Sequence, residues 1–131
     1  MTFDELKQRI NGVIESEWTQ HANGLGWVKN TAHADASARI DGIVSGDAWV
    51  SGDARVSGNA HLLLVGPIGS RRTFLSIYAD AKVKLRFTTG CFSGTRAQLV
   101  AAIKKTHKSG TLYRKQYDAA LVMAKIVRSF K

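Results

Sequence analysis

Residues 35–64 can be written as five successive sixes: DASARI, DGIVSG, DAWVSG, DARVSG and NAHLLL. In every six the second residue is Ala or Gly and the fourth is Ala, Val or Leu, and residues 29–34 read as a degraded sixth copy. An α-helix turns through about 600° in six residues, so each copy would reach a different face of a helix. The period of six therefore indicates short strands that stack as a β-solenoid.

These residues, and the repeated Val-Ser-Gly-Asp-Ala above all, resemble the hexapeptide-repeat family of left-handed parallel β-helices. The resemblance implies that three sixes make one triangular coil, with equivalent positions of successive coils about 4.8 Å apart. On this register Asp35 stacks on Asp53, Asp41 on Asn59 and Val44 on Leu62. We interpret the column of aspartates as residues that stabilise turns at exposed corners of the coil. A metal site or an active site is the alternative.

So few repeats make fewer than two coils, and repeat architectures need neighbours or caps to cover their ends. Either the flanking segments of the chain cap the coil, or copies of the chain associate through its faces. We expect a homo-oligomer, either a trimer or a dimer.

The flanking segments carry helix and hairpin signals. Residues 2–16 place apolar residues at helical spacing, and Thr2 with Glu5 fits a capping box. After a turn at 66–69, residues 73–78 and 82–88 read as two strands. Thr95 and Gln98 fit a second capping box, which opens a helix that ends near His107, and a last helix carries an apolar stripe from Tyr113 to Val127.

The predicted fold class is therefore mixed α+β: an N-terminal helix, a short left-handed parallel β-helix of hexapeptide repeats, then a β-hairpin plus two C-terminal helices. We expect three parts, with an N-terminal helix and connector at 1–28, the β-helix at 29–65 and a basic α+β unit at 66–131.

Charge is distributed unevenly along this chain of 131 residues, whose formal net charge is +9. Residues 1–70 carry five basic and eight acidic residues (5 − 8 = −3), whereas residues 71–131 carry fourteen basic and two acidic residues (14 − 2 = +12). The C-terminal half is therefore where an anionic partner would bind. No apolar run approaches the roughly 20 residues of a membrane span. With a single cysteine and no apolar leader, we expect a cytoplasmic protein without membrane contact.

Two basic features are candidate anion sites. The first is the loop 66–72, whose glycines free backbone N–H groups beside Ser70, Arg71 and Arg72. The second is the alternation of Lys82, Lys84 and Arg86 along a predicted strand, at about 6.6 Å spacing. The alternatives are an ordinary turn with solvated arginines, and the charged outer face of any half-exposed hairpin. Further lysines that would extend the surface are Lys104, Lys105 and Lys108.

Cys91 and His107 are the only pair of residues in the sequence that could serve as a nucleophile and its base, and Thr95 begins the helix between them. About 18 Å would separate Cys91 from His107 if they lay at opposite ends of that helix, so we expect a structural cysteine and a helix-end histidine rather than a catalytic pair. No Cys/His cluster has the spacing of metal ligands, and we expect neither a metal nor a cofactor.

The coil followed by Gly-Pro-Ile-Gly-Ser-Arg (66–71), Gly-Cys-Phe-Ser-Gly-Thr (90–95) and Thr-His (106–107) resembles a group of small bacteriophage and prophage proteins. The resemblance implies a phage accessory protein. By analogy of context we expect a non-enzymatic, stoichiometric inhibitor of host defence in the host cytoplasm, either anti-CRISPR-like or sequestering a nucleotide signal. The expected partner is an acidic host-defence protein, guide RNA or DNA, or an anionic nucleotide. A structural virion or baseplate protein and a Cys/His enzyme are the alternatives.

Overall fold

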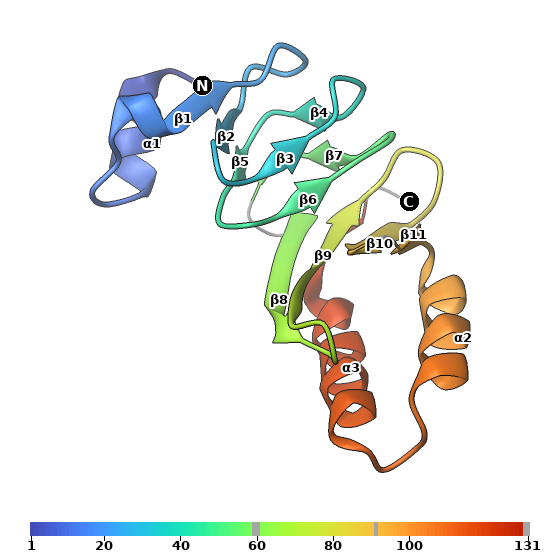
Figure 1. The fold of residues 1–131 in the computed structure, drawn as a ribbon. Coiled ribbons are helices and arrows are strands. Elements are labelled where there is room, and N and C mark those ends of the chain that lie inside the picture. The colour runs from blue at the N-terminus through green and yellow to red at the C-terminus, as the bar shows by residue number, and fades with distance from the viewer. Residues whose placement is uncertain (59–60, 91, 130–131) are drawn as a thin grey trace.

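The computed structural model describes residues 1–58, 61–90 and 92–129. Six short strands come first in the repeat region, and a larger sheet with two helices follows (Figure 1). The short strands are β2 (Trp27–Lys29), β3 (His33–Ala34), β4 (Arg39–Ile40), β5 (Ile43–Val44), β6 (Trp49–Val50) and β7 (Arg55–Val56).

The chain makes two passes through this region, residues 27–40 and residues 43–56, and the passes pair in parallel. β2 pairs with β5, β3 with β6 and β4 with β7. The side chains between the passes are aliphatic and small, so they pack together as a hydrophobic core. Within it Ile40, Val44 and Val50, together with Val56, are fully buried. This core holds the two passes together because each of these side chains leaves water.

The expected continuous left-handed parallel β-helix is wrong. In the part of the chain that the structure describes there are three separate parallel pairs, and the remaining strand pairs are antiparallel. Paired residues are also 16 positions apart, as Val28 and Val44 show (44 − 28 = 16), rather than three sixes. Asp35 therefore does not stack on Asp53. Val44 pairs with Val28, whereas Leu62, on which it was expected to stack, pairs with Tyr78 of the larger sheet. The expected pairing of Asp41 involves Asn59, which lies outside the described residues.

A tight corner at Asp41 and Gly42 causes the shift of register. Val44, Val50 and Val56 keep the period of six, but β4 ends at Ile40, only four residues before Val44. The backbone N–H groups of Asp41 and Gly42 both donate to the Val56 carbonyl oxygen, at 2.9 and 3.0 Å. A Cβ at Gly42 would lie 3.1 Å from the backbone nitrogen of Gly58, so the corner suits glycine.

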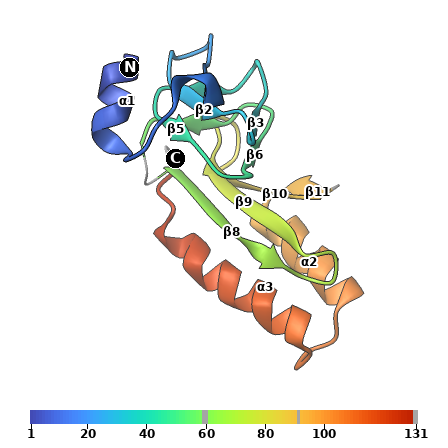
Figure 2. The ribbon, with the colours of Figure 1, turned by 60° about the vertical axis from the view of Figure 1, so that its left-hand side comes forward.

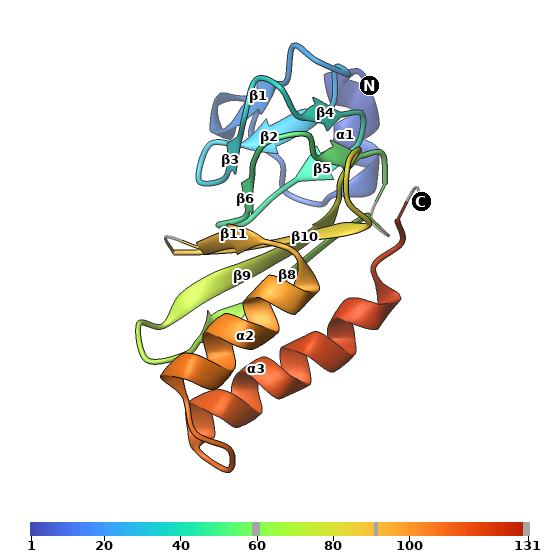
Figure 3. The ribbon, with the colours of Figure 1, turned by 90° about the vertical axis from the view of Figure 1, so that its right-hand side faces the viewer.

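The larger sheet is antiparallel throughout, in the order β11-β10-β9-β8. Its strands are β8 (Leu62–Ile68), β9 (Thr73–Ala79), β10 (Leu85–Thr89) and β11 (Phe92–Gly94). Alternation along β9 serves two cores: Leu75 and Ile77 pack toward the helices, whereas Tyr78 packs among the side chains of the two passes. The sheet therefore lies between the passes and the helices (Figure 3).

Polar side chains of β9 accept hydrogen bonds from backbone N–H groups of the second pass. The Trp49 backbone N–H donates to the Ser76 hydroxyl at 2.9 Å, and the Ser51 backbone N–H donates to the Tyr78 hydroxyl at 3.1 Å. At the other end of the repeat region β1 (Trp18–Gln20) pairs antiparallel with β2. Flanking segments of the same chain thus cover the two passes.

The N-terminal and C-terminal helices agree in part with the sequence prediction. α1 (Phe3–Arg9) begins at Thr2, which accepts the Glu5 N–H at 3.2 Å, but it is shorter than expected because the chain turns at Gly12 with φ +72°. α1 lies beside the passes, far from the C-terminal helices (Figure 2). The other helical elements are η1 (Glu15–Glu17), α2 (Arg96–Thr106), α3 (Leu112–Met123) and η3 (Ala124–Ile126).

The strand predicted at 82–88 begins later, at Leu85. The buried carboxylate of Asp80 accepts the backbone N–H groups of Lys82 and Val83 at 2.8 and 3.1 Å, which bends the chain before the strand starts. Lys82 and Lys84 consequently lie in a loop, and the predicted row of three cations on one strand face does not form.

Candidate functional site

A cleft of about 280 Å³ opens beside the helices, at the end of the sheet away from the two passes. Four parts of the chain meet there: the β8–β9 turn, the β10–β11 turn with β11, the end of α2, and α3. We call it the cleft. Its polar and aromatic lining residues are Ser70, Arg71, Thr73, Thr89, Phe92, Thr106, His107 and Tyr117.

Contacts with α3 hold the β8–β9 turn in place. The Gly69 backbone N–H donates to the Gln116 side-chain oxygen at 2.9 Å. Gly69 has φ +78°, and a Cβ at this position would lie 2.5 Å from the Tyr117 hydroxyl oxygen. Only glycine combines that backbone conformation with such a close approach, so the turn seats directly on Tyr117 and presents Ser70 and Arg71 to the cleft.

His107 reaches the cleft as the residue that caps the C-terminal end of α2. Its backbone N–H donates to the Ile103 carbonyl at 2.8 Å, and its own carbonyl accepts from the Arg114 guanidinium at 3.4 Å. Its ring lies against two tyrosines of α3, with centroids 5.7 Å from Tyr113 and 5.8 Å from Tyr117. Burial raises the pKa of Tyr117, so its hydroxyl keeps its proton and can donate a hydrogen bond.

The cleft is positively charged, and no carboxylate is present among the described residues that line it. The two acidic residues of the C-terminal half are both engaged elsewhere, Asp80 with Arg86 at 3.0 Å and Asp118 with Arg114 at 3.2 Å. Arg71 makes no ion pair with any residue that the structure describes. An arginine with hydroxyl donors and aromatic rings around it can bind a phosphate or carboxylate that is attached to a planar group.

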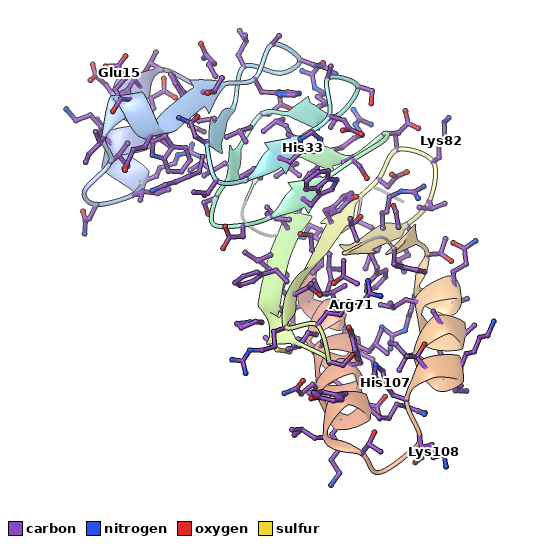
Figure 4. The ribbon with its side chains drawn as sticks, viewed as in Figure 1. Glu15, His33, Arg71, Lys82, His107 and Lys108 are labelled. Carbon is purple, nitrogen blue, oxygen red and sulfur yellow. The ribbon has the colours of Figure 1, made fainter. Side chains whose placement is uncertain are left out.

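The structure separates the other predicted anion-binding residues. Arg72 is exposed beside Arg71 but does not line the cleft. Lys82 pairs with Asp53 at 3.1 Å, and Arg86 belongs to the buried pair with Asp80. Figure 4 shows Arg71 near His107, with Lys82 far from both and Lys108 beyond the end of α2. The remaining predicted lysines, all exposed, are Lys84, Lys104, Lys105 and Lys108.

Thr95 and His107 act as the two caps of α2. The Thr95 hydroxyl accepts the Gln98 N–H at 3.4 Å, and the Gln98 side chain accepts the Thr95 N–H at 2.9 Å, which completes the predicted capping box. Gly90 and Phe92 line the cleft together with His107, because β11 and then α2 fold back along the sheet. Cys91 itself lies outside the described residues.

Sequence reasoning missed the aromatic wall of the cleft. Tyr117 was assigned only to the apolar stripe of the last helix, and Phe92 was noted only as part of a motif. The tyrosines at 113 and 117, four positions apart, do signal one helix face, but nothing local indicates that a histidine from another helix lies against them. In the described ranges no group of three His, Cys, Asp or Glu residues is placed to hold a metal ion.

The chain matches no family model, no curated protein and no solved structure. Within the part of the chain that the structure describes, every helix is too short or too polar to cross a bilayer.

Proposed function

We propose that the protein is a stoichiometric binding protein for a small phosphorylated ligand, of the nucleotide class, which it holds in the cleft. The observation that carries this proposal is that Arg71, His107 and Tyr117 line one cleft, whose described lining residues include no carboxylate. Arg71 contacts the phosphate, the nearby hydroxyl groups donate to its oxygens, and the aromatic rings lie against the base.

The size of the cleft favours a small ligand over a polymer. Its volume of about 280 Å³ lies just below the lower bound of roughly 300 Å³ for small-molecule sites. A nucleic-acid surface would need a longer track of cations, and the predicted row Lys82, Lys84 and Arg86 is broken by two ion pairs. Of the two forms of host-defence inhibition expected from the sequence, the geometry therefore favours sequestration of a nucleotide signal.

Isothermal titration calorimetry of the full chain with AMP, adenosine and inorganic phosphate tests the proposal. AMP should bind more tightly than either of its parts, because it alone occupies the arginine and the aromatic wall together. Replacing Arg71 with Ala should weaken AMP binding tenfold or more, as expected for loss of a charged hydrogen bond of about 1.5–3 kcal/mol.

Arg72→Ala is the matched control, since it removes the same charge from the neighbouring exposed position outside the cleft lining. An equal loss of AMP affinity in both variants would contradict the proposal, as would the absence of saturable binding by AMP. Native mass spectrometry of protein purified at low salt would show any retained ligand and would count the subunits of the predicted homo-oligomer.

A further inference from the structure

A second hollow lies at the opposite end of α2 from the cleft, and we call it the groove. Its volume is about 610 Å³, and it is bounded by the loop before β10, the first turn of α2 and the segment after α3. Its floor is aliphatic, formed by Val83, Leu85, Ala124 and Val127. Ala124 and Val127 also belong to the core under the helices, so the floor is a rigid part of the fold.

Three cations from three separate segments surround this floor: Lys84, Arg96 and Lys125. Arg96 is held in place because its guanidinium donates to the Leu121 carbonyl oxygen at 2.9 Å. Among the described residues, none that lines the groove carries a carboxylate, and none forms a salt bridge with any of the three cations. Their positive charge is therefore free to attract an anionic partner.

We propose that the groove docks an acidic peptide segment of a protein partner, in which carboxylates alternate with aliphatic side chains. The aliphatic side chains bury against the floor, and the carboxylates meet Lys84, Arg96 and Lys125 at the rim. Charge complementarity selects an acidic partner, and the floor selects one that is also apolar. This docking site is independent of ligand binding in the cleft.

The lining distinguishes a peptide from a nucleic acid. Single-stranded nucleic acids bind through bases stacked on aromatic side chains, and none of the described residues that line the groove is aromatic. An aliphatic floor offers nothing to a phosphate backbone but removes leucine-like side chains from water. The peptide is therefore the occupant that uses both the floor and the rim.

Fluorescence anisotropy with the full chain tests the docking site. The probe is a labelled peptide of about twelve residues made of Glu and Leu; the comparison probes are a Glu and Ser peptide of equal charge and an oligothymidylate of equal length. The Glu and Leu peptide should bind most tightly. Replacing Lys84 and Lys125 together with Ala should weaken its binding about tenfold, because both rim contacts are lost.

The control is the double variant Lys104→Ala and Lys105→Ala, which removes the same charge from the exposed last turn of α2. Binding of the Glu and Leu peptide should be nearly unchanged in this control. The proposal is overturned if both double variants weaken binding equally, if the Glu and Ser peptide binds as tightly, or if the Glu and Leu peptide does not bind. It is also overturned if the oligothymidylate binds as tightly and is equally sensitive to loss of Lys84 and Lys125. A thermal unfolding curve for each variant confirms that the fold is retained.

Discussion

Arg86 donates to the carboxylate of Asp80 at 3.0 Å, and this carboxylate is completely buried whereas the arginine side chain is 24% exposed. The same carboxylate accepts two backbone N–H groups of the following loop. Sequence alone presented Arg86 as a free anion-binding residue. In the structure it compensates a buried charge and fixes the loop that delays the start of β10.

Replacing Asp80 with Asn should therefore destabilise the protein strongly, by about 3 kcal/mol, because it leaves the partly buried Arg86 without its counter-charge. The matched change Asp53→Asn breaks the exposed pair with Lys82 and should cost less than about 1 kcal/mol. Urea unfolding of both variants measures the two losses. Equal losses would show that the Asp80 charge is not what holds this loop.

Acid should destabilise the protein in two steps. Burial and then the nearby charge of Arg128 lower the pKa of His61 below its ordinary 6.5, so the unfolded chain takes up this proton first and stability falls as the pH drops through about 6.5. The hydrogen bond from the Ser57 N–H to His61 Nδ1, 3.2 Å long, also requires an unprotonated ring nitrogen. The urea midpoint measured from pH 8 to pH 5 should show this decline, and His61→Asn, which keeps an acceptor, should flatten it.

The second loss of stability in acid occurs below the ordinary carboxyl pKa of 3.8, and it comes from Asp35 and Asp80. The Gly52 N–H, with a smaller contribution from His33, lowers the pKa of Asp35. Burial raises the pKa of Asp80, but two backbone N–H groups and Arg86 together outweigh burial and lower it. Both carboxylates therefore contribute stability above pH 3.8 that is lost as the pH falls further. A urea midpoint that stayed constant from pH 4 to pH 2.5 would contradict this assignment.

Tyr78→Phe should cost about 1–3 kcal/mol, although it removes a single oxygen atom. The hydroxyl accepts the Ser51 N–H and lies 2.7 Å from the Thr88 hydroxyl, so its loss leaves buried polar groups without partners. Tyr113→Phe, at an exposed position on α3, should change stability by less than about 0.5 kcal/mol. Chemical denaturation distinguishes the two. A neutral Tyr78→Phe would mean that water or another group replaces the hydroxyl.

Gly69→Ala tests how the β8–β9 turn is seated. Positive φ alone costs about 1–2 kcal/mol for alanine, and the new Cβ would also collide with the Tyr117 hydroxyl. Gly110→Ala supplies the control, because Gly110 has φ +85° with open space around it. Thermal unfolding should show a larger loss at position 69, and calorimetry should show weaker AMP binding there. Equal losses at both positions would mean that the turn relaxes without disturbing Tyr117.

Short-range signals in the sequence predicted the local structure well. The capping box of Thr95 and Gln98 depends on residues three apart, and the structure contains both of its hydrogen bonds. The strand register could not be found in this way. It depends on the corner at Asp41 and Gly42, which is fixed by hydrogen bonds to Val56 on the next pass. The spacing of the valines alone favoured a regular coil of three sixes. Nothing in the repeat pattern indicates that the corner is two residues shorter than in such a coil, so that paired residues are 16 positions apart.

The cleft could be predicted only in part, because it too depends on contacts between segments that are distant in the sequence. Ser70, Arg71 and His107 were recognised as polar residues beside turns, but their meeting depends on how a hairpin and two helices pack. The ion pairs of Lys82 and Arg86 could not be predicted, because strand alternation says which face a side chain occupies and not which carboxylate reaches it. Asp53, the partner of Lys82, comes from the repeat region, far away in the sequence.

Strand β9 supplies Leu75 and Ile77 to the core beneath the helices and Tyr78 to the core of the two passes. Neither core is complete without this strand, so local opening of one exposes apolar surface of the other. The repeat region and the helices should then melt in one cooperative transition, and a cut between them should leave fragments that fold only when they recombine.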